Sequence, residues 1–138
     1  MVAAKHTVCL IDDDNIYQYT ARVLLESTGM AGNIQSFYNG LEAIKFLKEE
    51  QEKPSEALPD MIFLDINMPV MNGWEFLEEY GKFSHLLPRP IALYVVSSSV
   101  DSSDIQKSRS YQTVTDYLVK PVNRNKFREL IENLEKPV

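Results

Sequence analysis

Cysteine is nearly absent from this sequence, because Cys9 is the single one in 138 residues. One cysteine cannot form a disulfide within the chain, which excludes a disulfide-stabilised secreted scaffold and fits a reducing compartment. Cys9 lies inside an apolar run, so we expect its thiol to be buried and unreactive.

Long hydrophobic runs are also missing. No stretch approaches the about 20 apolar residues that a membrane-spanning helix needs. The segment Met1 to Lys5 is too short for a secretory signal peptide. We therefore expect a cytoplasmic protein with no membrane insertion.

Basic residues are outnumbered, with 14 Lys and Arg against 20 Asp and Glu, a net charge of −6 and a pI near 4.9. Proteins that bind nucleic acid or an anionic membrane through electrostatic attraction need clustered Lys and Arg. This balance argues against both and favours a protein partner or a cation.

What the chain does contain is enough apolar sequence for one folded core. Its 138 residues, of which 44% are hydrophobic and 25% charged, are typical of one globular domain, which we expect to span residues 1–138. Hydrophobic patterning predicts strands at His6–Ile11, Ile34–Phe37, Asp60–Leu64, Ile91–Val96 and Val114–Val119. It predicts helices at Ile16–Thr28, Gly40–Glu50, Trp74–Tyr80, Ser102–Arg109 and Arg124–Leu134. The alternation predicts an α/β fold of the flavodoxin-like (βα)5 type, a doubly wound parallel sheet with strand order 2-1-3-4-5.

The connecting segments carry clear turn and cap signals. Asp14 or Asn15 is suited to cap the first helix, whose predicted apolar face is formed by residues at helical spacing: Ile16, Tyr19, Val23 and Leu24. The segment 29–33 is expected to form a turn, and the segment 51–59, with its two prolines, a surface loop.

Three aspartates follow predicted strands. Asp12 and Asp13 follow the first strand and Asp65 follows the third. The carboxyl ends of parallel strands meet at one edge of the sheet, so these carboxylates should gather there, which is costly unless a cation neutralises them. Because every ligand on offer is an oxygen, the sequence favours Mg²⁺ over zinc.

Lys120 and Ser97 follow the fifth and fourth predicted strands and should reach the same edge. A lysine there can pair with Asp65 or with a phosphoryl oxygen, and a serine hydroxyl can hydrogen-bond a phosphoryl oxygen. These groups around one carboxylate suit the charge of a transferring phosphoryl group, with Asp65 as the nucleophile.

With these residues, the chain from about Thr7 to Leu134 resembles the receiver domain of two-component response regulators, in a single-domain, chemotaxis-regulator-like form. The resemblance implies that Asp65 is the phosphoacceptor and that Lys120 binds the phosphoryl group. It also implies a Mg²⁺ site in which Asp13 is a direct ligand, Asp12 its acidic neighbour, and Asp65 and the backbone carbonyl of Asn67 further ligands.

The resemblance assigns switch roles as well. It makes Ser97 the switch hydroxyl, with Ser98 beside it contacting the phosphoryl group through its backbone, and Tyr117 the rotating aromatic residue. In such domains phosphorylation remodels the face formed by the fourth helix, fifth strand and fifth helix. The Lys120–Pro121 bond resembles a cis peptide of the family, although cis is a minority state for X-Pro bonds in general.

The implied function is a phosphorylation-controlled switch in a phosphorelay. A sensor histidine kinase or histidine phosphotransfer protein would donate to Asp65, and the altered face would contact a downstream protein target, with homodimerisation through that face as a further option. The chain would be no conventional enzyme, although it would catalyse its own Mg²⁺-dependent phosphorylation and dephosphorylation, with Asn67 and Ser99 flanking the attacking water.

Three alternatives remain open at this point. The chain could be a pseudo-receiver that signals without phosphate, although all the acidic residues and the lysine are present. A haloacid-dehalogenase-like phosphatase would need a second aspartate where Asn67 stands. A flavin-binding module is permitted by the fold, but the acidic cluster would repel the flavin phosphate.

Overall fold

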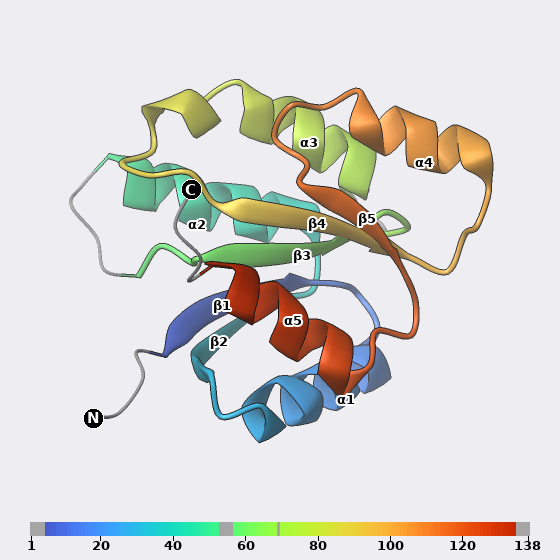
Figure 1. Ribbon diagram of the computed structural model, residues 1–138. Helices are drawn as coiled ribbons and strands as arrows, with labels where there is room; N and C mark the ends of the chain where they lie inside the picture. The colour runs from blue at the N-terminus through green and yellow to red at the C-terminus, as the bar shows by residue number, and fades with distance from the viewer. Residues whose placement is uncertain (1–4, 53–56, 69, 135–138) are drawn as a thin grey trace.

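In the computed structural model, the strands form one parallel sheet in the order β2-β1-β3-β4-β5, as the sequence predicts (Figure 1). The structure describes residues 5–52, 57–68 and 70–134. The strands are β1 His6–Ile11, β2 Ala31–Phe37, β3 Met61–Asp65, β4 Ala92–Ser97 and β5 Asp116–Val119.

Helices cover both faces of the sheet (Figure 1). They are α1 Asn15–Ser27, α2 Gly40–Gln51, α3 Gly73–Gly81, the short 3-10 helix η1 Ser84–Leu86, α4 Ser102–Arg109 and α5 Arg124–Leu134. Because side chains alternate along a strand, Cys9 and Ile11 of β1 pack on the α2 and α3 side, whereas Val8 and Leu10 pack on the α1 and α5 side. The buried central strands thus belong to two cores, one on each face.

The predicted boundaries match those of β1, α4 and α5 and lie within one residue of the others, apart from the starts of β2 and β5; η1 was not predicted. β2 begins earlier than predicted, at Ala31, because its backbone already pairs with His6 of β1 there. β5 begins later, at Asp116, because Val114 is still held in a turn by a hydrogen bond from its N–H to the carbonyl of Tyr111. In the predicted surface loop 51–59, Gln51 belongs to α2, Leu58 is buried, and residues 53–56 lie outside the described residues.

The predicted apolar face of α1 is wrong for Ile16, Tyr19 and Val23, which are exposed, whereas Leu24 is partly buried against the core as predicted. Ile16 and Tyr19 are 79% and 70% exposed, and the buried residues of this helix are Gln18, Ala21 and Leu25. Gln18 decides the orientation, because its Nε2 donates hydrogen bonds to the carbonyls at the carboxyl ends of β1 and β2, those of Leu10, Asp12 and Phe37. A polar side chain therefore faces the sheet, and an apolar stripe faces outward.

Two smaller predictions are confirmed. Asp14 caps α1, since its side chain accepts hydrogen bonds from the N–H groups of Ile16 and Tyr17. Cys9 is fully buried, and burial raises the pKa of its thiol far above the usual range, which makes it unreactive. Among the residues that the structure describes, no helix has the length and apolar character needed to cross a membrane.

Candidate functional site

The three predicted aspartates lie together at the carboxyl edge of the sheet. Asp12 and Asp13 follow β1, and Asp65 ends the neighbouring strand β3. One carboxylate oxygen from each residue lies within 4.8 Å of those of the other two. Asp12 and Asp65 are 2% and 7% exposed, whereas Asp13 is exposed. The cluster is therefore open to solvent on the Asp13 side.

Lys120 lies against two of these carboxylates. Its Nζ donates a hydrogen bond of 2.7 Å to Oδ2 of Asp12 and lies 3.6 Å from Oδ1 of Asp65. The Lys120–Pro121 peptide that follows is cis, as the family resemblance implies. The ammonium compensates part of the negative charge that the fold concentrates at this edge.

Tyr17 is a further member of this site that was not predicted from the sequence. The Lys120 Nζ lies over its ring, 4.2 Å from the centroid, in a cation–π arrangement. The Tyr17 hydroxyl is buried and has no hydrogen-bond partner among the described residues. Burial, and then the charges of Asp12 and Asp65, raise the pKa of this phenol, so it stays neutral. No motif marks Tyr17, but its place in the first turn of α1 is the signal that could have identified it.

The electrostatics of Asp65 are set mainly by burial. Burial, and then the charges of Asp12 and Asp13, raise the pKa of its carboxyl group from 3.8 to about 6. The Lys120 ammonium and a hydrogen bond from the N–H of Asn67 act in the opposite direction. A second cation near Asp65 would favour the ionised form, which is the nucleophilic one.

The start of α3 fixes the backbone of Asp65. The N–H of Gly73 donates to the carbonyl of Ile66, and Asn72 and Glu75 form a capping box at this helix end. A Cβ on Gly73 would lie 2.6 Å from the carbonyl oxygen of Asp65. The helix therefore approaches the end of β3 at a distance that only glycine permits.

Ser97 and Tyr117 are linked through Ser99. Ser97, at the end of β4, is 1% exposed, and its Oγ accepts a hydrogen bond of 3.0 Å from the N–H of Ser99. The hydroxyl of Tyr117 on β5 donates to the carbonyl of Ser99 at 2.8 Å, and the Ser99 hydroxyl donates to Asp104 of α4. One residue of the β4–α4 loop thus connects the end of β4, β5 and α4.

The roles predicted for the site residues remain predictions, and so do two further contacts, those of Ser98 and Asn67. Ser98, which follows Ser97, and Asn67, which lies two residues after Asp65, are both exposed. The phosphoryl contact of the first and the carbonyl ligand of the second depend on groups that bind at the site. The oxygen-only cluster of Asp12, Asp13 and Asp65 fits Mg²⁺, a hard cation that keeps part of its water shell, because one carboxylate is exposed and can share the ion with water.

A family model described as the response regulator receiver domain matches residues 8–132. The chain belongs to this family. This receiver domain is 26% identical over 128 residues to the probable methanogenesis regulatory protein FilR2 of Methanothrix harundinacea, covering 93% of the chain and 80% of that protein. It spans only 13% to 53% of the length of several other curated relatives.

Solved structures agree. A two-component response regulator from Cytophaga hutchinsonii superimposes with a TM-score of 0.86 at 29% identity, covering 96% of this chain and 98% of that one. The phosphorylated cyanobacterial phytochrome response regulator RcpA has a TM-score of 0.69 at 25% identity, covering 96% and 92%. The receiver domain is thus a two-component signalling module with the flavodoxin-like fold.

Proposed function

We propose that this receiver domain accepts a phosphoryl group on Asp65 and transmits its phosphorylation state through protein contacts. The main support for this proposal is the surroundings of the Asp65 carboxylate. It is buried, it lies in one cluster with Asp12 and Asp13, and the Lys120 ammonium is 3.6 Å away. Asp65, the proposed nucleophile, therefore has two carboxylates beside it that can hold a cation. It also has a lysine beside it that can bind a phosphoryl oxygen.

In the proposed transfer, an Asp65 oxygen forms a bond to phosphorus while the P–N bond of a phosphohistidine breaks. The electron pair of that bond stays with the imidazole nitrogen of the donor. Lys120 then faces the phosphoryl oxygens as a fixed positive charge, and its bond to Asp12 holds it there. Hydrolysis would restore the carboxylate when water attacks phosphorus and the acyl P–O bond breaks.

Mg²⁺ would be held by Asp12, Asp13 and Asp65, with the carbonyl of Asn67 and water completing its shell. When bound, the ion neutralises negative charge on the transferring phosphoryl group. Within the chain, Lys120 would orient the phosphoryl group and Asp65 would accept it.

The response would pass from Ser97 to Tyr117. Ser97 ends β4 beside the acidic edge, and its hydroxyl can turn to a phosphoryl oxygen because its present interaction is a single accepted bond from Ser99. Since the Tyr117 hydroxyl is bonded to the carbonyl of Ser99, movement of that loop changes the support of Tyr117 and α4. The face of α4, β5 and α5 is the proposed contact surface for a downstream protein or a second copy.

The proposed donor is a sensor histidine kinase or histidine phosphotransfer protein. An outward apolar stripe on α1, formed by Ile16, Tyr19 and Val23, begins next to the acidic cluster and suits the apolar face of a donor helix. The relative RcpA was crystallised in a phosphorylated form, which supports the same chemistry here.

The test is intact mass after incubation with phosphoramidate, with and without Mg²⁺. The wild type should gain the mass of one phosphoryl group only with Mg²⁺, Asp65→Asn should gain none, and the matched control Asp14→Asn should behave as wild type because asparagine also caps a helix. A folded wild type that gains no mass would support the pseudo-receiver alternative instead.

A further inference from the structure

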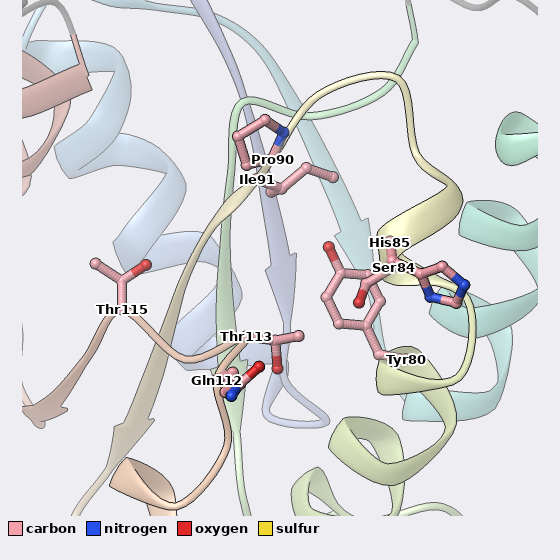
Figure 2. A pocket seen from close by; sticks show the side chains of 8 residues that line it. All are labelled: Tyr80, Ser84, His85, Pro90, Ile91, Gln112, Thr113 and Thr115. Atoms are coloured by element: carbon pink, nitrogen blue, oxygen red, sulfur yellow. The ribbon is translucent and has the colours of Figure 1, made fainter. Parts of the chain in front are cut away.

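A cavity of about 310 Å³ opens at the opposite edge of the sheet from the acidic cluster. It lies between the end of α3 with η1 on one side and the segments that lead into β4 and β5 on the other (Figure 2). Its lining residues are Tyr80, Ser84, His85, Pro90, Ile91, Gln112, Thr113 and Thr115. Because Ile91 and Thr115 precede β4 and β5, the cavity is separated from Asp65 by the length of the sheet.

Tyr80 contributes a hydroxyl that no hydrogen bond within the described residues uses. The residue is 2% exposed, and its ring packs against Phe76 and Phe83, each with a centroid distance of 5.6 Å. Its hydroxyl makes no hydrogen bond to any part of the chain that the structure describes, and it points away from α3 toward the cavity (Figure 2). The tyrosine ring is held in the core while its hydroxyl lines the cavity, so this hydroxyl is available to a molecule there.

Other polar side chains around the cavity are also available. Ser84, His85, Gln112 and Thr113 make no side-chain hydrogen bond to another described residue. The hydroxyl of Thr115, in contrast, accepts a bond of 3.2 Å from the N–H of Leu93. Two separate segments, 84–85 and 112–113, thus place unpaired hydrogen-bond donors and acceptors around the same cavity.

The lining carries no carboxylate, lysine or arginine, and burial raises the pKa of Tyr80 to about 12, so that its phenol remains a neutral donor. The Tyr80 ring, Pro90 and Ile91 add apolar surface. Apart from the imidazole of His85, the described lining residues offer no group that could pair with an ionic ligand. An uncharged molecule with a flat apolar part and a polar group would find partners for both.

The volume of the cavity is larger than a single structural water requires. A single water occupies about 30 Å³ in the liquid, so the cavity has room for a cluster of waters or for one small organic molecule. It falls at the small end of the range of about 300 to 1,000 Å³ that is typical of ligand pockets.

We propose that this cavity is a binding site for a small, uncharged, hydrogen-bonding molecule with an aromatic or similarly flat face, anchored by the Tyr80 hydroxyl. Such a molecule would connect η1 with the segment before β5, the strand that carries Tyr117. The site is distinct from the acidic cluster and shares no lining residue with it.

The test is an amide NMR titration of the full chain with three uncharged probes: benzamide, nicotinamide and benzyl alcohol. Benzoate, the charged counterpart of benzamide, serves as the ligand control. At least one uncharged probe should give saturable shifts at residues 84, 91, 112, 113 and 115, and benzoate should bind at least about tenfold more weakly.

Tyr80→Phe should weaken binding of that probe roughly fivefold to tenfold, because it removes one hydrogen bond and keeps the ring. Tyr94→Phe, a buried tyrosine in the core on the other face of the sheet, should leave binding unchanged. The proposal is overturned if no probe gives saturable shifts, which means a hydrated cavity only, or if Tyr80→Phe binds the probe as the wild type does.

Discussion

The ammonium of Lys120 lies over the ring of Tyr17, 4.2 Å from its centroid. Because the same ammonium donates a 2.7 Å hydrogen bond to Asp12, the lysine is held from two sides at the acidic edge. Its position next to Asp65 therefore depends on an aromatic side chain of α1 as well as on charge.

Tyr17→Leu removes the ring face and should slow phosphorylation by phosphoramidate about threefold to tenfold, the equivalent of about 1 kcal/mol of cation–π attraction. Tyr17→Phe keeps the ring and should stay within about twofold of the wild-type rate. Initial rates at saturating Mg²⁺ measure the effect. Equal rates for the leucine variant and the wild type would show that the carboxylates of Asp12 and Asp65 position Lys120 without the Tyr17 ring.

Asp65→Asn should make the Mg²⁺-free protein more stable at neutral pH. Burial raises the pKa of Asp65 from 3.8 to about 6, so the folded state binds this proton more tightly than the unfolded state does. The ionised carboxylate therefore destabilises the fold above about pH 6, and it has no such effect below the unfolded pKa. Urea unfolding should show a gain on the order of 1 kcal/mol for the variant, after allowance for solvent screening.

That gain should shrink as the pH falls from about 6 toward 3.8, because Asp65 becomes protonated in both states. Asp14→Asn, at an exposed cap position, is the matched control and should show no comparable gain. A gain for Asp65→Asn that is independent of pH would assign the effect to packing instead of charge.

Mg²⁺ binding to the wild type should weaken when the pH falls below about 6, because the ion must displace the proton of Asp65. Calorimetric titrations across this pH range measure the affinity and the protons released. Asp65→Asn should bind Mg²⁺ more weakly and lose this pH dependence. If the wild-type affinity is the same on both sides of pH 6, Asp65 is not part of the ion site.

Gly73→Ala should destabilise the domain by about 1 to 3 kcal/mol and displace Asp65, because the new Cβ meets backbone atoms at 2.6 and 2.7 Å. Gly81→Ala, at the other end of the same helix, meets nothing within 4 Å and should be neutral or slightly stabilising. Thermal unfolding compares the two variants. A Gly73→Ala protein as stable as the wild type would contradict the close approach of α3 to β3.

The outward apolar stripe of α1 should affect the rate of phosphoryl transfer from a protein donor and not the rate from a small molecule such as phosphoramidate. Ile16→Ser with Tyr19→Ser should slow transfer from a phosphorylated histidine phosphotransfer protein that is active on the wild type by about tenfold, through loss of exposed apolar contacts. The phosphoramidate rate should not change. Leu86→Ser, another exposed apolar residue, is the control. Equal transfer rates would exclude α1 from the donor contact.

The sheet and the acidic cluster were predictable because both follow from local signals. Short apolar runs, each followed by a polar residue, define parallel strand ends, and topology brings Asp12, Asp65 and Lys120 to one edge. The orientation of α1 was not predictable in this way. Its apolar periodicity is real, but the buried amide of Gln18, bonded to strand carbonyls, turns that periodicity outward.

Contacts between distant segments account for what else the sequence left open. The start of β2 is set by backbone pairing of Ala31 with His6. The mostly polar sequence of β2 does not indicate this pairing. The contact of Tyr17 with Lys120 joins residues from opposite ends of the chain. The cavity beside Tyr80 is likewise lined by three segments that share no motif.

Reductive trapping identifies the residue that carries the phosphoryl group, which we propose to be Asp65. Borohydride converts an acyl phosphate to an alcohol, so peptide mass spectrometry after phosphorylation and reduction reports the modified position. We expect homoserine at position 65 alone, and only when Mg²⁺ is present during phosphorylation. Modification at Asp12 or Asp13, or a phosphoryl group that resists reduction on a serine or histidine, would contradict it.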